Sequence, residues 1–197
     1  MSLMMYFEGN EVIIMQAATT PNRRLKDVSK TRWITITALF MGLNIAMSSF
    51  GIPVPGGHLY LCDTVICTAA LLLDPVAAFV VGGIGSFLGD MIFYPLPMYV
   101  SLATHGLQAV VIALIEGRAM YASNKKHFVT ALIATLIGAV IMVTGYTLGK
   151  TFVYATFEYA MIKLPYEIAQ ALLGVVGSLL LCFKGGLIKI FKRMELN

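Results

Sequence analysis

Two pairs of polar residues recur at helical spacing inside long apolar segments of the chain. His105 and Gln108 are three residues apart, and so are Glu167 and Gln170. Residues at this spacing share one face of an α-helix. Imidazole, amide and carboxylate groups are costly at membrane depth, so they are candidates for a functional site by default. The two pairs therefore predict a hydrogen-bonding site between helices.

Further polar and aromatic residues fall near the same predicted ends of their helices. Tyr146 lies four residues before Lys150, His58 and Tyr60 accompany a loop rich in proline and glycine, and Asp90 ends a glycine-rich apolar segment. Donors, acceptors and aromatic rings that gather at one end of a helical bundle are typical of a small-molecule pocket. The predicted substrate-binding residues are His58, Tyr60, Asp90, His105, Gln108, Tyr146, Lys150, Glu167 and Gln170.

Each of these residues also has a purely structural interpretation. A single His or Gln in a membrane helix more often bonds a neighbouring helix than a ligand. Asp63 and Asp90 are equally explained as caps or as partners of other polar groups near an interface, and tyrosines at helix ends, such as Tyr60, are typical of an interfacial belt. The prediction of a pocket therefore depends on the clustering and not on any one residue.

The composition places these residues in a membrane protein. Hydrophobic residues make up 58% of the 197 residues and charged residues 12%, against about a quarter in soluble domains. Several apolar segments reach the length of about 18 residues that marks membrane helices. The net charge of +4 favours basic cytoplasmic edges over nucleic-acid binding. The cysteines Cys62, Cys67 and Cys182 form no CxxC pair, so neither a disulfide, a metal site nor a cofactor is expected.

The apolar segments predict an all-α integral membrane protein with six transmembrane helices. Their expected ranges are residues 32–50, 59–73, 76–94, 98–121, 128–149 and 166–190. Pro53 and Pro55 exclude a helix from the loop between the first two. Residues 122–127 are expected to form a polar break, and residues 150–165 a connection. Residues 1–30 are then a cytoplasmic N-terminal tail, and residues 31–193 are one membrane domain that binds substrate.

The distribution of basic residues predicts the orientation of this domain. Six spans place the N-terminal tail, the loop between the fourth and fifth helices and the C-terminal end on one side. All Lys and Arg except Lys150 and Lys163 fall on that side. The positive-inside rule therefore predicts that both termini are cytoplasmic and that the polar helix ends face outward.

The first predicted helix carries a row of small residues at Ala38, Gly42 and Ala46. Because they are four apart, they share one face, and such a face lets a second helix approach closely in lipid. The row is expected to dock a partner protein. The alternative is that it packs against helices of the same chain.

The sequence gives little support to catalysis. The segment from Gly145 to Thr151 resembles a P-loop, but Thr144 occupies the place of its first glycine and the segment ends a membrane helix. The acids Asp63 and Asp90 match the motifs of intramembrane aspartyl proteases poorly. No catalytic residue is therefore predicted, and the chain is not expected to be an enzyme.

Residues 32–191 resemble a substrate-binding S component of an energy-coupling factor (ECF) vitamin transporter. The resemblance depends on the six predicted spans, the row Ala38-Gly42-Ala46, the loop GIPVPGGHLYL and the run DPVAAFVVGGIGSFLGD from Asp74 to Asp90. The family's helix signature is AxxxA, whereas this chain has AxxxG followed by GxxxA. Glycine is smaller than alanine, so the docking surface is expected to persist.

The resemblance implies a function in uptake across the cell membrane. Family members bind a vitamin near the outer face and dock on a transmembrane coupling protein with two ATPase subunits. The chain looks most similar to S components for hydroxymethylpyrimidine or pyridoxine. Pantothenate is an alternative, with Lys150 as the cation for its carboxylate, while riboflavin or folate needs a larger pocket. A stand-alone small-molecule carrier, or a membrane scaffold with no ligand, is the alternative from another class.

Overall fold

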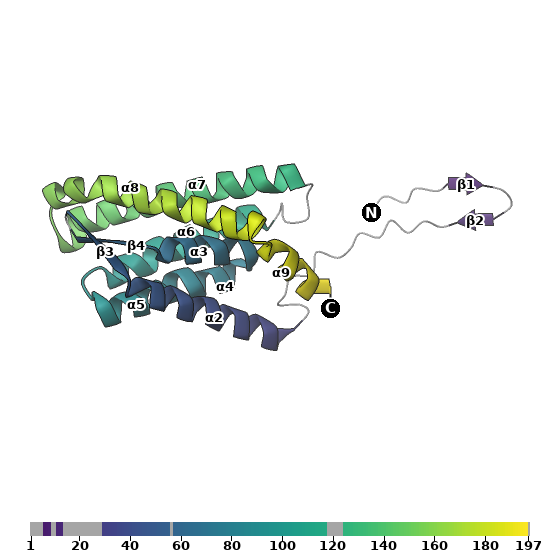
Figure 1. The fold of residues 1–197 in the computed structure, drawn as a ribbon, viewed down its shortest axis with the longest axis horizontal. Coiled ribbons are helices and arrows are strands. Elements are labelled where there is room, and N and C mark those ends of the chain that lie inside the picture. Colours follow the sequence, from purple (N-terminus) through teal and green to yellow (C-terminus); the bar gives the residue numbers. More distant parts are fainter. Residues whose placement is uncertain (1–5, 9–10, 14–28, 56, 118–123, 197) are drawn as a thin grey trace.

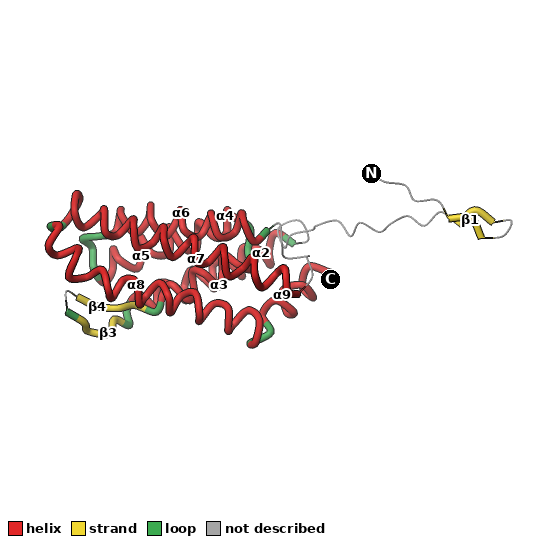
Figure 2. The backbone as a smooth tube through the Cα atoms, turned by 90° about the horizontal axis from the view of Figure 1, so that it is seen from above, coloured by secondary structure: helices red, strands yellow, loops and turns green. Residues whose placement is uncertain are grey.

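The computed structural model describes residues 6–8, 11–13, 29–55, 57–117 and 124–196. The predicted tail of residues 1–30 falls mostly outside this range. Within it, strands β1 (Tyr6–Glu8) and β2 (Glu11–Ile13) pair antiparallel. The described chain from residue 29 onward is a helical bundle with one β-hairpin at one end (Figures 1 and 2).

The helices of the bundle run back and forth along its long axis (Figure 1). They are α2 (Lys30–Ser48), α3 (Cys62–Leu72), α4 (Pro75–Phe79) continued by η1 (Val80–Ile84) and α5 (Gly85–Phe93), α6 (Met98–Glu116), α7 (Asn124–Gly149) continued by η2 (Lys150–Tyr154), α8 (Phe157–Leu179) continued by η3 (Leu180–Lys184), and α9 (Leu187–Leu196). The segments η1, η2 and η3 are single turns of π-helix. The hairpin of β3 (Gly51–Val54) and β4 (Gly57–Tyr60) lies at the end opposite α9.

Polar side chains fix where the helices begin. The Asp74 carboxylate caps α4 by accepting hydrogen bonds from the backbone N–H groups of Val76 (3.1 Å) and Ala77 (3.4 Å). The indole N–H of Trp33 donates to the same carboxylate, which ties the start of α2 to the start of α4. Thr156 caps α8 by accepting from the backbone N–H of Tyr159 at 3.3 Å.

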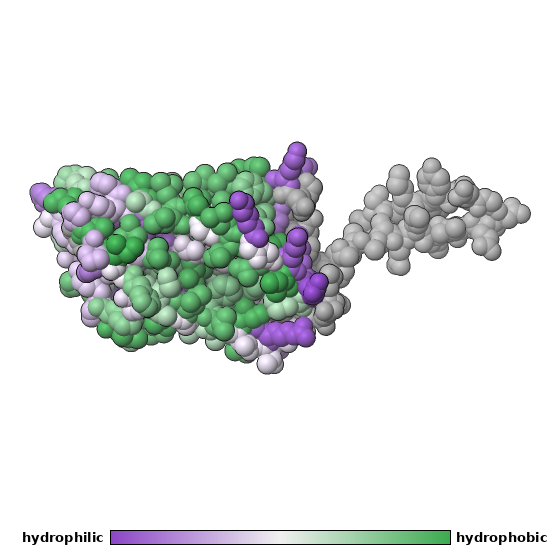
Figure 3. Space-filling model, viewed as in Figure 1, coloured by the Kyte–Doolittle hydropathy of each residue, from purple (hydrophilic) through white to green (hydrophobic). Residues whose placement is uncertain are grey.

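Small side chains are common in the interior of the bundle, and many large apolar side chains point outward. Ala69, Ala77, Ala109 and Ala134 are fully buried, while the described helices expose many Leu, Ile, Val and Phe side chains. Figure 3 shows the resulting apolar surface, with strongly hydrophilic side chains gathered at the end where α9 lies. Small residues between helices and an apolar exterior are the arrangement expected in lipid.

Among the described residues, four helical segments are long and apolar enough to cross a membrane. They are Pro75–Phe93, Met98–Glu116, Lys125–Tyr154 and Phe157–Lys184. Helix α3 is apolar but has only 11 residues, and α2 has 19 residues but does not meet the same criterion. The structure therefore confirms an all-α membrane protein, whereas six spans stay a prediction.

The predicted connection over residues 150–165 is wrong. Helix α7 continues through η2 to Tyr154, and α8 starts at Phe157, so the break spans only Ala155 and Thr156. Pro165 lies inside α8, where membrane helices tolerate proline because neighbouring groups compensate for the missing N–H donor.

Other predicted boundaries also differ, and α6 ends at Glu116 and not at residue 121. The second helix starts at Cys62 and not at residue 59, because Leu59 and Tyr60 belong to β4. The C-terminal helix ends its membrane segment at Lys184, and Gly186 with a φ of 75° separates it from α9. A positive φ is readily adopted by glycine alone, so the chain turns there and α9 forms a separate helix. The predicted polar break at residues 122–127 is wrong for residues 124–127, which belong to the start of α7, and residues 122–123 lie outside the described residues.

Candidate substrate-binding site

The described part of the structure contains a cavity of about 180 Å³ at the hairpin end of the bundle. Residues from β4, α2, α3, α5, α6, α7, η2 and α8 line it. They are Ser48, His58, Tyr60, Cys62, Ser86, Asp90, Tyr94, Pro97, His105, Met142, Tyr146, Lys150, Tyr154, Tyr159, Lys163, Glu167 and Gln170. Tyrosines and charged groups dominate this wall, although the surrounding helices are mostly apolar.

The structure brings nearly all of the predicted site residues to this cavity. His58, Tyr60, Asp90, His105, Tyr146, Lys150, Glu167 and Gln170 line it. Gln108 does not, because its buried side chain bonds His105 and Asp63 between helices. Gln108 therefore has the interhelical role that was the structural alternative, and binding of substrate by the other residues stays a prediction.

Several lining residues on α8 and η2 are not among the predicted site residues. Tyr154, Tyr159 and Lys163 fell in the segment that was predicted to be a connection. A signal was present, since Tyr159, Lys163, Glu167 and Gln170 follow one another at intervals of four, four and three residues. This spacing places them on one helix face. Tyr94 and Tyr154 lie at helix ends, where a tyrosine also fits an interfacial belt.

A buried ion pair joins η2 to α8 at the cavity wall. The Lys150 ammonium contacts the Glu167 carboxylate, and the two side chains are 5% and 4% exposed. The Lys150 nitrogen also lies 5.0 Å from the centre of the Tyr146 ring and 6.0 Å from that of Tyr154, close enough for cation–π attraction. Charges buried in this way require a partner, so Lys150 and Glu167 stabilise each other.

A second buried network surrounds Asp63 behind the cavity. The Nε2 amide of Gln108 donates to one carboxylate oxygen of Asp63 at 3.2 Å, and that of Gln170 donates to the other at 2.6 Å. His105 Nδ1 lies 2.7 Å from Gln108 Oε1. Since the amide oxygen only accepts, this contact places the imidazole proton on Nδ1. A Cβ at Gly174 would lie 2.8 Å from Asp63 Cβ, so only glycine lets α8 approach α3 closely enough for these bonds.

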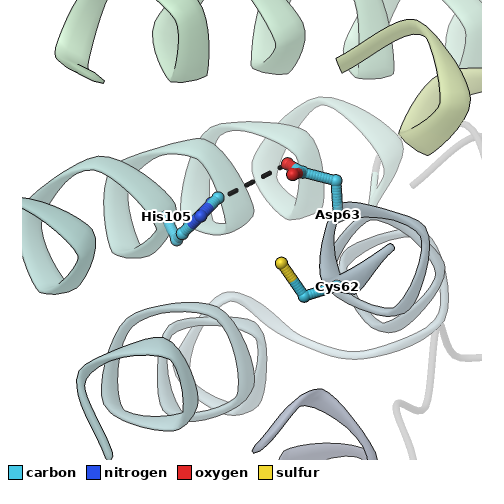
Figure 4. Close-up of side chains that lie close together, drawn as sticks. All are labelled: Cys62, Asp63 and His105. Atoms are coloured by element: carbon cyan, nitrogen blue, oxygen red, sulfur yellow. Dashed lines mark ion pairs between the residues drawn. The ribbon is translucent and has the colours of Figure 1, made fainter. Parts of the chain in front are cut away.

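Cys62, Asp63 and His105 offer potential metal-ligating atoms within 4.8 Å of one another (Figure 4). Both carboxylate oxygens of Asp63 and the Nδ1 of His105 already have hydrogen-bond partners. The amide network therefore accounts for the position of these groups without a metal.

Asp90 faces the cavity from α5 in a chain of hydroxyl groups. The Ser101 hydroxyl donates to its carboxylate, and Ser101 Oγ lies 2.5 Å from the Tyr146 hydroxyl oxygen. The Tyr146 ring packs edge-on against His105 with ring centres 5.3 Å apart. Asp90, Tyr146 and His105 thus form one continuous polar wall.

The β3–β4 hairpin covers the cavity and is bonded to α8. The Lys163 ammonium donates to the His58 backbone carbonyl at 2.5 Å, and the Tyr60 backbone N–H donates to Gln170 Oε1 at 3.0 Å. Pro53 pairs with His58 in the hairpin, where an edge strand tolerates the missing donor. Burial raises the pKa of the Tyr60 phenol, so this group stays a neutral donor at physiological pH.

The predicted docking row lies on the outside of the bundle. Ala38, Gly42 and Ala46 are exposed on α2, and a Cβ added at Gly42 would meet no atom within 4 Å. The structure therefore gives this row no packing role within the described chain.

An apolar helical bundle with a cavity beneath a hairpin at one end defines a membrane-embedded protein with a pocket for a small molecule. The family model described as "ECF-type riboflavin transporter, S component" matches residues 28–185, which is most of the chain, and the chain belongs to this family. The chain is also 28% identical over 127 residues to an uncharacterized protein from Pyrococcus woesei, over 64% of this chain and 81% of that protein. The protein is thus an S component of an ECF vitamin transporter and a multi-pass membrane protein.

Proposed function

We propose that this S component captures hydroxymethylpyrimidine or pyridoxine outside the cell and delivers it by docking on a coupling protein with two ATPase subunits. The observation that carries the proposal is the cavity beneath the hairpin, whose wall contains five tyrosines and four charged side chains. Its volume of about 180 Å³ lies below the roughly 300–1,000 Å³ of pockets for drug-sized ligands, which favours a single-ring ligand.

The lining groups favour these ligands over the alternatives. Hydroxyl, imidazole and carboxylate groups match the ring nitrogens and hydroxymethyl groups of a small heterocycle. Pantothenate is an open chain without a ring, and Lys150, the cation predicted for its carboxylate, is already paired with Glu167. Riboflavin, which the family description names, has three fused rings and a ribityl chain and fits a larger cavity.

The docking surface that we propose is the row Ala38-Gly42-Ala46. Its support is its exposure on α2 and the open space around Gly42. Close contact between small residues is the main source of helix association in lipid, where joining apolar helices brings little hydrophobic gain.

Co-expression with coupling and ATPase subunits tests the proposed function. The purified chain should be recovered with these subunits, and native mass spectrometry of the chain alone should detect a retained vitamin. Transport by the chain alone would instead indicate a stand-alone carrier. A chain that shifts its unfolding temperature with no vitamin and recovers no partner would refute the proposal.

We further propose six spans with both termini cytoplasmic. Helices α2 and α3, added to the four long apolar segments, make up the six spans. The hairpin and α9 lie at opposite ends of the bundle (Figure 1). Lys150 and Lys163, the basic residues at the hairpin end, point into the cavity and not into a loop. The basic residues in the described loops and at the described helix ends therefore gather at the α9 end.

Cysteine labelling tests this orientation. In a background without Cys62, Cys67 and Cys182, an impermeant thiol reagent added to intact cells should modify Pro55→Cys and spare Lys125→Cys. Both positions are exposed, at opposite ends of the bundle, so accessibility within the protein does not bias the comparison. Permeabilised cells provide the control, since both variants should then react. Labelling of Lys125→Cys alone in intact cells would reverse the assignment.

A further inference from the structure

The charged groups of the cavity wall do not all neutralise one another. Asp90, Lys150, Lys163 and Glu167 line the cavity. Lys150 and Glu167 form an ion pair. Asp90 and Lys163 are in no ion pair with another described residue, so neither charge has an opposite charge from the described chain beside it.

Asp90 is a carboxylate that accepts from a neutral group. Its described hydrogen-bond partner is the Ser101 hydroxyl, and no Lys, Arg or His nitrogen of the described chain lies within 4.0 Å of it. The Ser101 hydroxyl supplies one donor, whereas a carboxylate offers about four lone-pair sites. The carboxylate therefore keeps accepting capacity directed at the cavity.

Lys163 is the corresponding cation. Its side chain is buried, and its ammonium donates to the backbone carbonyl of His58 at 2.5 Å. An ammonium carries three donors, and a carbonyl supplies no full counter-charge. The group therefore keeps donors for a further acceptor in the cavity.

The two groups come from different sides of the bundle. Asp90 lies on α5 and Lys163 on α8, and these helices lie along opposite edges of the bundle at the hairpin end in Figure 1. Because a charge removed from bulk water is costly without a partner, two such charges in one cavity favour an occupant that satisfies both.

We infer that the ligand is a small dipolar heterocycle, with a cationic or N–H donor edge on Asp90 and an anionic or strongly accepting oxygen on Lys163. This inference rests on the proposed function and specifies the ligand of that same cavity. A 3-hydroxypyridine such as pyridoxine fits both groups, because its ring nitrogen binds a proton and its phenol oxygen loses one. An aminopyrimidine carries no anionic oxygen for Lys163, and pantothenate carries no cationic edge for Asp90.

Isothermal titration calorimetry of the protein in detergent, with pyridoxine as the probe, tests the inference. Asp90→Asn and Lys163→Gln should each weaken binding about tenfold or more, since each removes a charge-assisted hydrogen bond from a site largely shielded from water. The matched controls Glu158→Gln and Lys125→Gln remove the same charges from exposed positions outside the cavity and should leave affinity unchanged.

Ligand analogues provide a test that needs no variant to fold. A pyridoxine analogue with hydrogen in place of the phenol hydroxyl group should bind the unaltered protein at least about tenfold more weakly. Equal affinity for the analogue, or unchanged affinity in either cavity variant, would overturn the dipolar assignment. If the protein binds no dipolar probe but still recovers the coupling and ATPase subunits, this inference fails and the proposed function stands. Loss of assembly as well would refute both.

Discussion

Gly42→Leu is expected to abolish assembly with the coupling protein and ATP-driven uptake, and to leave ligand binding and the unfolding temperature nearly unchanged. The new side chain would enter open space on the outside of α2, because a Cβ there meets no atom within 4 Å. In the complex with the coupling protein, the same side chain would hold the partner helix away from α2, and the van der Waals contacts between the two helices would be lost. Complex recovery, uptake and ligand titration on this one variant separate the two effects.

Two matched substitutions control this experiment. Gly174→Leu places the same side chain where a Cβ would lie 2.8 Å from Asp63 Cβ, so it overpacks the bundle at a typical cost of about 1–3 kcal/mol. Ala103→Leu adds bulk at an exposed position of α6, away from the row. Gly174→Leu should lower stability and binding together, and Ala103→Leu should change neither assembly nor binding. Normal complex recovery with Gly42→Leu would show that the row is not the docking surface.

The helical architecture and the clustering of polar groups were predictable from the sequence. The apolar segments are long, the pairs at His105 and Glu167 fall at helical spacing, and the structure places both pairs on helices that pack against α3. The sequence does not predict which neighbouring element each side chain faces. Gln108 shares a face with His105 but bonds Asp63, because α3 and not the cavity lies opposite it.

The sequence was misleading where charge and proline coincide. Lys150, Lys163 and Pro165 are typical of a loop, since charges are rare within membrane helices and proline breaks soluble ones. In the structure the Lys150 charge is compensated by Glu167, and the Thr156 cap starts α8 before the proline. The ion pair joins residues that are 17 apart and is not visible in a single stretch of sequence, whereas the Thr156 cap is a local signal.

The hairpin illustrates a second limit. Pro53 and Pro55 correctly excluded a helix, but the pairing of Gly51–Val54 with Gly57–Tyr60 depends on what lies beneath it. Lys163 and Gln170 bond its backbone from more than 100 residues away in the sequence. An isolated two-stranded hairpin is marginal in water, so these contacts and the neighbouring bundle are what hold it over the cavity.

Glu167→Ala is expected to be strongly destabilising, by about 3–5 kcal/mol, because it leaves the buried Lys150 ammonium without its counter-charge. The double variant Lys150→Met with Glu167→Leu replaces the pair by apolar groups of similar size, and such replacements are often neutral for stability. The double variant should therefore recover most of the lost unfolding temperature. Thermal unfolding of the ligand-free protein in detergent measures this, with Glu158→Ala on the exposed first turn of α8 as the control.

The same variants separate a structural role of the pair from a role in binding. Both residues line the cavity, so the double variant should stay folded and still bind its ligand roughly ten- to a hundred-fold more weakly, the loss expected for a charge-assisted hydrogen bond. A double variant with both native stability and native affinity would show that the pair only joins η2 to α8. An unchanged unfolding temperature in Glu167→Ala would mean that the Lys150 ammonium finds another partner in the cavity wall. Lys150 would then be a cation that is available to bind the ligand.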